Sequence, residues 1–206
     1  IDPAGLVFTR GRWGSTFNGT SFQQEGMATY NGWQYATWFD SERRLCIGRR
    51  ELSDGQWQCI RFEDYRIRGN DSHNVPTLGV CGGDGTIHLS FDHHGHTLRY
   101  RVSRAGVATE PKKVRWKADL FGPVRDNLLP GRRVTGVTYP RFLPTPDGRI
   151  QLIYRRGGSG NGDWRLADYD PDKGRWICDE VFISRRGNYQ KSNSRCAYLN
   201  DPRDDH

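Results

Sequence analysis

The pattern of the chain is set by one stretch, Asp84-Gly85-Thr86-Ile87-His88-Leu89-Ser90-Phe91-Asp92-His93-His94. An Asp-Gly pair supplies the positive φ angles that a tight hairpin requires. The alternating residues after it are typical of a β-strand with one buried face. The same arrangement occurs at Asp54-Gly55 and at Asp147-Gly148. The sequence therefore predicts a series of antiparallel hairpins.

Working outward from this stretch, strand-like runs fall into three groups that are separated by turn signals. The expected strands are Trp33–Phe39, Leu45–Arg50 and Gln56–Phe62 in the first group, Asn74–Cys81, Ile87–His93, Leu98–Ser103 and Lys113–Leu120 in the second, and Val137–Leu143, Arg149–Arg155, Trp164–Tyr169 and Arg175–Ile183 in the third. The groups recur about every 50 to 60 residues, which is the period of β-propeller blades.

This period predicts an all-β protein, a β-propeller of four-stranded antiparallel blades. We expect one propeller domain over residues 1–206, with blades at approximately 20–65, 73–122 and 135–185 and a further blade beginning near 195. A blade buries its faces only against neighbouring blades. We therefore expect these three and a half blades to be the N-terminal part of a larger propeller, whose remaining blades are missing from this chain. A complete small β-sandwich is the alternative, and it leaves the repeat as a coincidence.

Composition supports β structure and narrows the partners. The chain has 25 Gly, 7 Trp, 9 Tyr, 9 Phe and a single Met, which suits turn-rich, aromatic-rich strands. Its formal net charge of +7 favours an acidic partner, but the basic residues are scattered and form no nucleic-acid motif. No apolar run approaches the roughly 20 residues that a membrane span requires. We expect neither nucleic acid nor a membrane as a partner.

The state of the cysteines is left open by their spacing. The five are widely separated and form no Cys-x-x-Cys pair, so disulfides, a zinc site shared with a histidine and buried thiols are all compatible with the sequence. Three lie in apolar, strand-like runs, which favours buried thiols. They are Cys46, Cys59, Cys81, Cys178 and Cys196.

Five of the six histidines lie between His73 and His96. Histidine can take and give a proton near neutral pH, so this clustering is the strongest chemical signal in the chain. His88, within an alternating strand, and His96, in a turn, are expected to be structural. His94 is nine residues after the hairpin glycine Gly85, and Arg155 is seven residues after Gly148. Side chains alternate between the two faces of a strand, so these two odd spacings predict that His94 and Arg155 lie on the same face and that His93 points to the other.

The entrances of the second and third groups carry His73 and Tyr139. Propellers usually place ligand sites at one mouth of the central channel, where blade ends converge. We therefore expect His73, His94, Tyr139 and Arg155 to surround one pocket. The structural alternatives are a core aromatic for Tyr139 and a surface strand arginine for Arg155.

Motifs in the same order occur in a known family. The motifs are Asp71-Ser72-His73-Asn74, Asp84-Gly85-Thr86-Ile87-His88, Asp92-His93-His94, Leu98-Arg99-Tyr100-Arg101, Thr138-Tyr139-Pro140-Arg141-Phe142, Tyr154-Arg155-Arg156-Gly157 and Ser159-Gly160-Asn161-Gly162. Together they resemble the BNR-repeat propeller proteins that include the ulvan lyases. The resemblance implies a seven-bladed, secreted or periplasmic polysaccharide lyase that cleaves rhamnose–uronic acid links of an acidic, sulfated polysaccharide by β-elimination.

Elimination from a uronate needs a neutralised carboxylate, a base for the C5 proton and an acid for the leaving oxygen. The resemblance makes His73 and Tyr139 the catalytic pair. Arg155 can grip the carboxylate bidentately, with help from His94. The remaining predicted substrate contacts are Asn74, Arg141, Arg156 and Asn161, with His93 as the substitute for His94.

Two other functions stay open at this level. A glycoside hydrolase that releases rhamnose from glucuronate would use the same His73, and a non-catalytic carbohydrate-binding propeller would need no proton transfer. Classical hydrolases use paired carboxylates, and none stands out in these motifs, which favours elimination. The chemistry requires no cofactor. A structural zinc or calcium ion would brace a blade, because the histidines are not spaced like a closed metal site.

Overall fold

Antiparallel β-strands make up nearly all the regular structure. The computed structural model describes residues 1–7, 10, 14, 16–19, 23, 25–53, 55–158 and 162–184. Within these residues the strands form three sheets, and the helical segments are two single turns of 3-10 helix. The expected all-β class is confirmed.

The first sheet follows the chain in order, β1-β2-β3-β4. Its strands are β1 (Met27–Tyr30), β2 (Trp33–Phe39), β3 (Arg44–Glu51) and β4 (Gln58–Arg66). The first hairpin turns at Asn31 and Gly32, whose φ angles of +48° and +76° are those of the two-residue turn that matches strand twist. The expected strand at 33–39 is confirmed with both its ends.

The second sheet has three described strands, in the order β5-β6-β8. They are β5 (Thr77–Val80), β6 (Ile87–Ser90) and β8 (Tyr100–Val102). At the hairpin between β5 and β6 only Gly85 has a positive φ, and the Asp84 side chain accepts the Thr86 N–H at 2.9 Å. This turn is therefore longer than the two-residue turn of the first sheet.

The prediction of a fourth strand here, at Lys113–Leu120, is wrong. The segment contains two 3-10 turns, η1 (Pro111–Lys113) and η2 (Ala118–Leu120). Pro111 lacks a backbone N–H and has a fixed φ, so it suits the first position of a helical turn and cannot donate to a sheet. The chain returns to the sheet as two isolated bridges, Phe121 with Ser103 and Arg125 with Tyr100.

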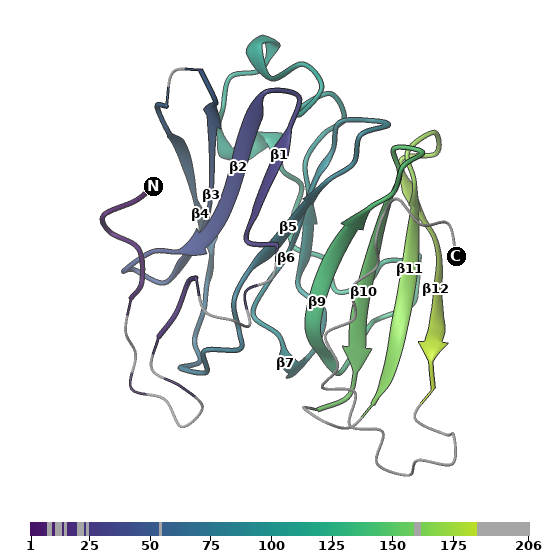
Figure 1. Cartoon of the computed structure of the whole chain (residues 1–206). Helices are drawn as coiled ribbons and strands as arrows, with labels where there is room; N and C mark the ends of the chain where they lie inside the picture. Colours follow the sequence, from purple (N-terminus) through teal and green to yellow (C-terminus); the bar gives the residue numbers. More distant parts are fainter. Residues whose placement is uncertain are drawn as a thin grey trace.

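The third sheet has five described strands, in the order β12-β11-β10-β9-β7. They are β7 (His94–His96), β9 (Val137–Pro144), β10 (Ile150–Arg156), β11 (Asp163–Asp170) and β12 (Arg175–Ile183). The strand β7 was not expected to pair here, because it belongs by sequence to the second group. Its pairing with β9 brings the end of the histidine-rich stretch onto the third sheet (Figure 1).

The three sheets follow one another in space, with β1, β5 and β9 as neighbouring strands (Figure 1). Buried aromatic and aliphatic side chains fill the interfaces, including Tyr35, Phe39 and Phe91 between the first two sheets. Between the second and third sheets the approach is closest at Gly79, where an added Cβ would lie 2.4 Å from the Cβ of Phe142. Glycine is therefore required at this point of β5.

The four cysteines among the described residues are free thiols, and burial raises the pKa of Cys46 to about 12 and that of Cys81 to about 11. These two are the buried thiols that we expected, whereas Cys196 and the expected strand at Arg195–Leu199 lie outside the described residues. Among the described residues, no helix is long and apolar enough to cross a membrane.

Candidate active site

Four side chains that the sequence singled out are brought together at the ends of β5, β7, β9 and β10. The imidazoles of His73 and His94 are stacked, with ring centroids 4.3 Å apart and planes inclined by 22°. The ring of Tyr139 lies 5.9 Å from that of His73 and 6.1 Å from that of His94. The guanidinium of Arg155 lies 5.6 Å from the centroid of Tyr139. These four side chains are therefore close together, whereas their expected arrangement around one pocket stays a prediction.

Tyr139 is aimed at the histidines by a bulge in β9. Arg155 pairs with Thr138 and Ile153 with Arg141, so the two residues between these pairs on β9 face a single residue of β10. Tyr139 has a φ of +53°, a left-handed conformation that costs a non-glycine residue about 1–3 kcal/mol. A bulge bends its strand and redirects a side chain. Regular pairing on either side holds the strained residue in place.

His94 and His93 point in opposite directions, as parity predicted. His93 is 1% exposed, and its Nε2 accepts the backbone N–H of Arg99 at 2.8 Å. The chain changes direction at Asp92, whose φ is +62°, and at Gly95, whose N–H donates to the Thr138 hydroxyl at 2.8 Å. Because its ring is enclosed in the protein, His93 offers no sugar contact in this structure, contrary to its predicted substrate-binding role.

Asp71 is a site residue that the sequence reasoning missed. One carboxylate oxygen, Oδ1, lies 2.5 Å from Nδ1 of His73, and the other, Oδ2, lies 2.6 Å from Nδ1 of His94. The His73 backbone N–H also donates to Oδ1 at 3.0 Å. Burial alone would raise the pKa of Asp71, but these hydrogen bonds outweigh it and hold that pKa below its ordinary value. The motif at 71–74 signalled the local turn, whereas the contact with His94 depends on the pairing of β7.

Asp71, His73 and His94 are also the one group of the described residues whose ligand atoms lie close enough for a metal, within 4.8 Å of one another. A histidine lone pair lies in the plane of its ring. With the two planes inclined by only 22°, the Nδ1 lone pairs run side by side and do not meet at one ion about 2.0–2.1 Å from each. A chelated ion would require one ring to rotate. The expected structural zinc or calcium ion stays a prediction.

Arg155 lies behind Tyr139. Its side chain is 1% exposed, and its guanidinium carbon is 5.0 Å from the ring centroid of Trp164 on the side of β11. A guanidinium between two aromatic rings is held by cation–π attraction and by dispersion. A direct bidentate grip on a sugar carboxylate would therefore require the Tyr139 ring to move aside.

The other predicted contacts are differently placed. Asn74 is 2% exposed and its amide donates to Asp92 at 2.5 Å, while Arg141 forms an ion pair with Glu25 at 2.7 Å. Both side chains thus connect protein segments. Arg156 is exposed at the end of β10, and Asn161 lies outside the described residues.

His88 confirms the structural role that was expected for it. It is fully buried, with Nδ1 2.7 Å from the hydroxyl of Tyr100 and Nε2 2.7 Å from that of Thr86. Burial lowers the pKa of His88 to about 3, so the ring is neutral at physiological pH. It is packed among aromatic rings, including that of Tyr169 at 4.6 Å, and lies apart from the stacked pair.

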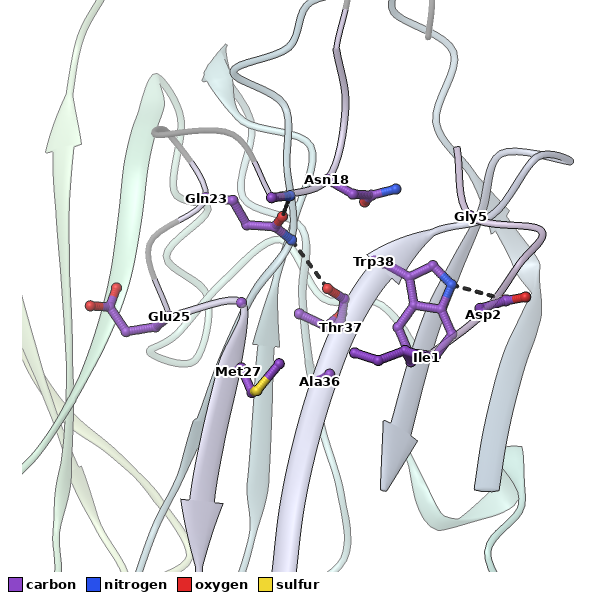
Figure 2. Close-up of a pocket in the computed structure, with 12 residues that line it drawn as sticks. Ile1, Asp2, Gly5, Asn18, Gln23, Glu25, Met27, Ala36, Thr37 and Trp38 are labelled. Atoms are coloured by element: carbon purple, nitrogen blue, oxygen red, sulfur yellow. Dashed lines mark hydrogen bonds between the residues drawn. The ribbon is translucent and has the colours of Figure 1, made fainter. Parts of the chain in front are cut away.

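A hollow of about 580 Å³ lies elsewhere, against the first sheet (Figure 2). Its polar groups are largely used within the protein: the indole N–H of Trp38 donates to Asp2 at 3.1 Å, and the amide of Gln23 donates to the Thr37 carbonyl at 3.1 Å. Glu25 is turned away from Trp38 in this view and reaches Arg141. The hollow contains none of the predicted catalytic side chains.

The chain is similar in sequence to known proteins. A profile of the BNR repeat-containing family matches residues 33–206. The long-isoform ulvan lyase of Pseudoalteromonas sp. (strain PLSV) is 29% identical over an alignment of 204 positions, which covers 81% of this chain and 20% of that protein. The short-isoform ulvan lyase of Alteromonas sp. (strain LOR) is 26% identical over an alignment of 202 positions, which covers 78% of this chain and 38% of that protein. The chain thus spans about a fifth of the long relatives.

Two solved structures have a similar fold. The polysaccharide lyase Uly1 superposes with a TM-score of 0.75 at 19% identity, over 88% of this chain and 45% of that one. A PL25 ulvan lyase bound to -[GlcA(1-4)Rha3S]- superposes with a TM-score of 0.58 at 16% identity, over 88% of this chain and 39% of that one.

Proposed function

The chain belongs to the BNR repeat-containing family, and we propose on this basis that it is part of a polysaccharide lyase that cleaves a rhamnose–uronic acid linkage by β-elimination. The observation that carries the proposal is the convergence of His73, His94 and Tyr139, with the charge of Arg155 behind the Tyr139 ring. The similar proteins named as ulvan lyases supply the reaction class.

An acidic polysaccharide is the substrate that best suits this chain. Its formal net charge is +7, which attracts a polyanion. The sugar in the PL25 ulvan lyase complex contains glucuronate and sulfated rhamnose, and both carry negative charge. We propose the same class of substrate here, met outside the cytoplasm in a secreted or periplasmic location.

The proton transfers fall to His73 and Tyr139. In the elimination the C5–H bond breaks, its electron pair forms the C4=C5 double bond, and the C4–O bond breaks with its pair leaving on the oxygen. One group takes the C5 proton and one protonates the departing oxygen. His73 has its Nδ1 against Asp71, so we assign the proton transfer to its other ring nitrogen, Nε2. The phenol of Tyr139 lies beside the same ring.

The carboxylate of the uronate must be neutralised for C5 to become acidic. His94 is the half-buried group that can reach it directly from the stacked pair. Arg155 contributes its positive charge from behind the Tyr139 ring, in surroundings where burial weakens dielectric screening. A shift of that ring in the substrate complex would convert this into direct contact.

We further propose that the three sheets are successive blades of one propeller, approximately residues 20–65, 73–122 and 135–185, with another blade beginning near 195. The support is their spatial order and the adjacency of β1, β5 and β9. A closed ring of about seven blades is expected from the family resemblance. The number of blades in a crystal structure of the full-length protein would test this arrangement.

The reaction is tested by the products that the full-length protein forms from a sulfated rhamnose–glucuronate polysaccharide. A lyase gives new reducing ends together with the ultraviolet absorbance of an unsaturated uronate. New reducing ends without that absorbance would overturn the proposal in favour of a hydrolase, and retention of the polymer without cleavage would overturn it in favour of a binding protein.

A further inference from the structure

One carboxylate holds both imidazoles of the stacked pair. Asp71 presents Oδ1 to Nδ1 of His73 and Oδ2 to Nδ1 of His94, at 2.5 and 2.6 Å. We propose that Asp71 is a positioning residue that fixes both histidines in the Nδ1–H form, so that Nε2 is the unprotonated nitrogen of each ring. Its catalytic consequence rests on the proposed lyase function, whereas the hydrogen-bond arrangement can be tested without it.

The proton positions follow from the chemistry of the three groups. An ionised carboxylate only accepts hydrogen bonds, and a neutral imidazole has one N–H. Two contacts of 2.5 and 2.6 Å to the two oxygens therefore require that each ring carries its proton on Nδ1. The Asp71 carboxyl stays ionised because its hydrogen bonds hold its pKa below the ordinary value. Each Nε2 is then a lone-pair acceptor, the form that a general base needs.

The arrangement also joins two parts of the fold. Asp71 and His73 lie in the loop before β5, whereas His94 begins β7, which pairs with the third sheet. The His73 backbone N–H donates to the same carboxylate and closes a short turn around it. Asp71 thus fixes the orientation of two rings that different sheets deliver. Losing that orientation lowers a rate even where binding persists, because proton transfer depends on geometry.

The carboxylate also compensates the charge that the reaction creates. When Nε2 of His73 takes the C5 proton, the ring becomes an imidazolium stacked 4.3 Å from His94. Its Nδ1–H then donates to Asp71 as a charge-assisted hydrogen bond, which is stronger than the neutral one. The stabilisation is greatest when the proton has been transferred, so it favours the transition state over bound substrate.

Asp71→Asn is the sharpest test, because an amide is isosteric but carries both a donor and an acceptor. Its oxygen can accept from one Nδ1–H, but its NH2 must donate to the other Nδ1, which moves that ring's proton to Nε2. We expect kcat of the full-length protein to fall by about 10²–10⁴, the size of a general acid–base contribution, with a much smaller change in KM. Asp168→Asn is the matched control, since Asp168 also accepts from two side chains, Gln151 and Cys178.

The tautomers themselves are read by ¹⁵N NMR of histidine-labelled full-length protein, with signals assigned through His73→Gln and His94→Gln. We expect Nδ1–H in both rings of the wild type, a proton on Nε2 of one ring in Asp71→Asn, and wild-type tautomers and rate in Asp168→Asn. A wild-type Nε2–H in either ring, or an Asp71→Asn enzyme with undiminished kcat, would overturn the proposal. Zinc binding that displaces both Nδ1 protons at stoichiometric concentration would overturn it too. If the protein proved not to be a lyase, the NMR result would still decide the arrangement.

Discussion

His88 and His94 are six residues apart in one stretch, yet the fold gives them opposite surroundings. His88 lies on the regular strand β6, fully buried, between the hydroxyls of Tyr100 and Thr86. His94 begins β7, half buried, against a carboxylate and a second imidazole. The same side chain is therefore a neutral core group in one place and a candidate proton carrier in the other.

The difference arises from the regularity of the backbone. Along β6, regular pairing with β5 places alternate side chains on opposite faces, and all four are buried. Between β6 and β7 the positive φ angles of Asp92 and Gly95 interrupt that alternation, and the bulge at Tyr139 does the same in β9. The groups suited to chemistry are found where strand pairing is irregular. Strain of this kind is often retained at functional sites.

The largest effect that separates the two regions is expected from Tyr139→Phe. The variant keeps the ring that packs beside the histidines and over Arg155 but loses the phenol proton. We expect the rate of unsaturated product formation to fall by about 10²–10⁴ while the polysaccharide still binds. Steady-state kinetics and a binding titration of the full-length protein measure the two parts. Near-normal turnover would remove Tyr139 from the reaction.

His88→Ala should produce the converse result. It opens a cavity among packed aromatic rings and removes the partner of the buried Tyr100 hydroxyl, so we expect a loss of about 3 kcal/mol in the free energy of unfolding. Denaturant titration measures it. Activity of the fraction that stays folded should be close to that of the wild type, and a selective loss of kcat in a stable variant would contradict the core role of His88.

The pH dependence of stability sharpens the same contrast. The pKa of His88 is lowered to about 3 by burial, whereas an unfolded histidine titrates near 6.5. Between these values the unfolded chain binds a proton that the folded chain does not, so stability is lost as the pH falls below about 6.5. The loss is about 1.4 kcal/mol per pH unit for one such group. Denaturation midpoints at pH 7 and pH 5 should lie closer together in His88→Gln than in the wild type, and buried His93, whose pKa is also lowered by burial, keeps part of the slope. An unchanged pH slope would show that His88 does not contribute to it.

A smaller effect is expected from Arg155→Lys, which keeps a positive charge but loses the planar group held between Tyr139 and Trp164. Loss of that packing is worth about 0.5–2 kcal/mol, so the rate should fall by roughly tenfold. In Arg155→Gln, which removes the charge as well, the rate should fall further. Equal rates for the two variants would mean that Arg155 acts by holding the Tyr139 ring and not through its charge.

The features that sequence predicted are those that neighbouring residues determine. Strand β12 was predicted at both its ends. Different surroundings for the neighbouring His93 and His94 were also predicted, and the structure buries His93 and leaves His94 half buried. The strand expected at Lys113–Leu120 failed because one proline before it starts a helical turn. In each case the residue that decides the local structure lies within a few positions of it in the sequence.

The features that sequence did not predict depend on distant pairing. Asp71 was quoted within a motif, but its second oxygen meets His94 only because β7 joins β9. The burial of Arg155 likewise depends on the ring of Tyr139 turning across it from the neighbouring strand. Local alternation can indicate which residues share a face, and the partners across that face are set by packing.

The most direct test of the division between a reactive pair and an inert core histidine is His73→Ala in the full-length protein. We expect formation of the unsaturated uronate to fall by about 10²–10⁴, while the free energy of unfolding changes by about 1 kcal/mol, because the lost ring is partly exposed to solvent. Wild-type rates of unsaturated product with an intact fold would contradict it.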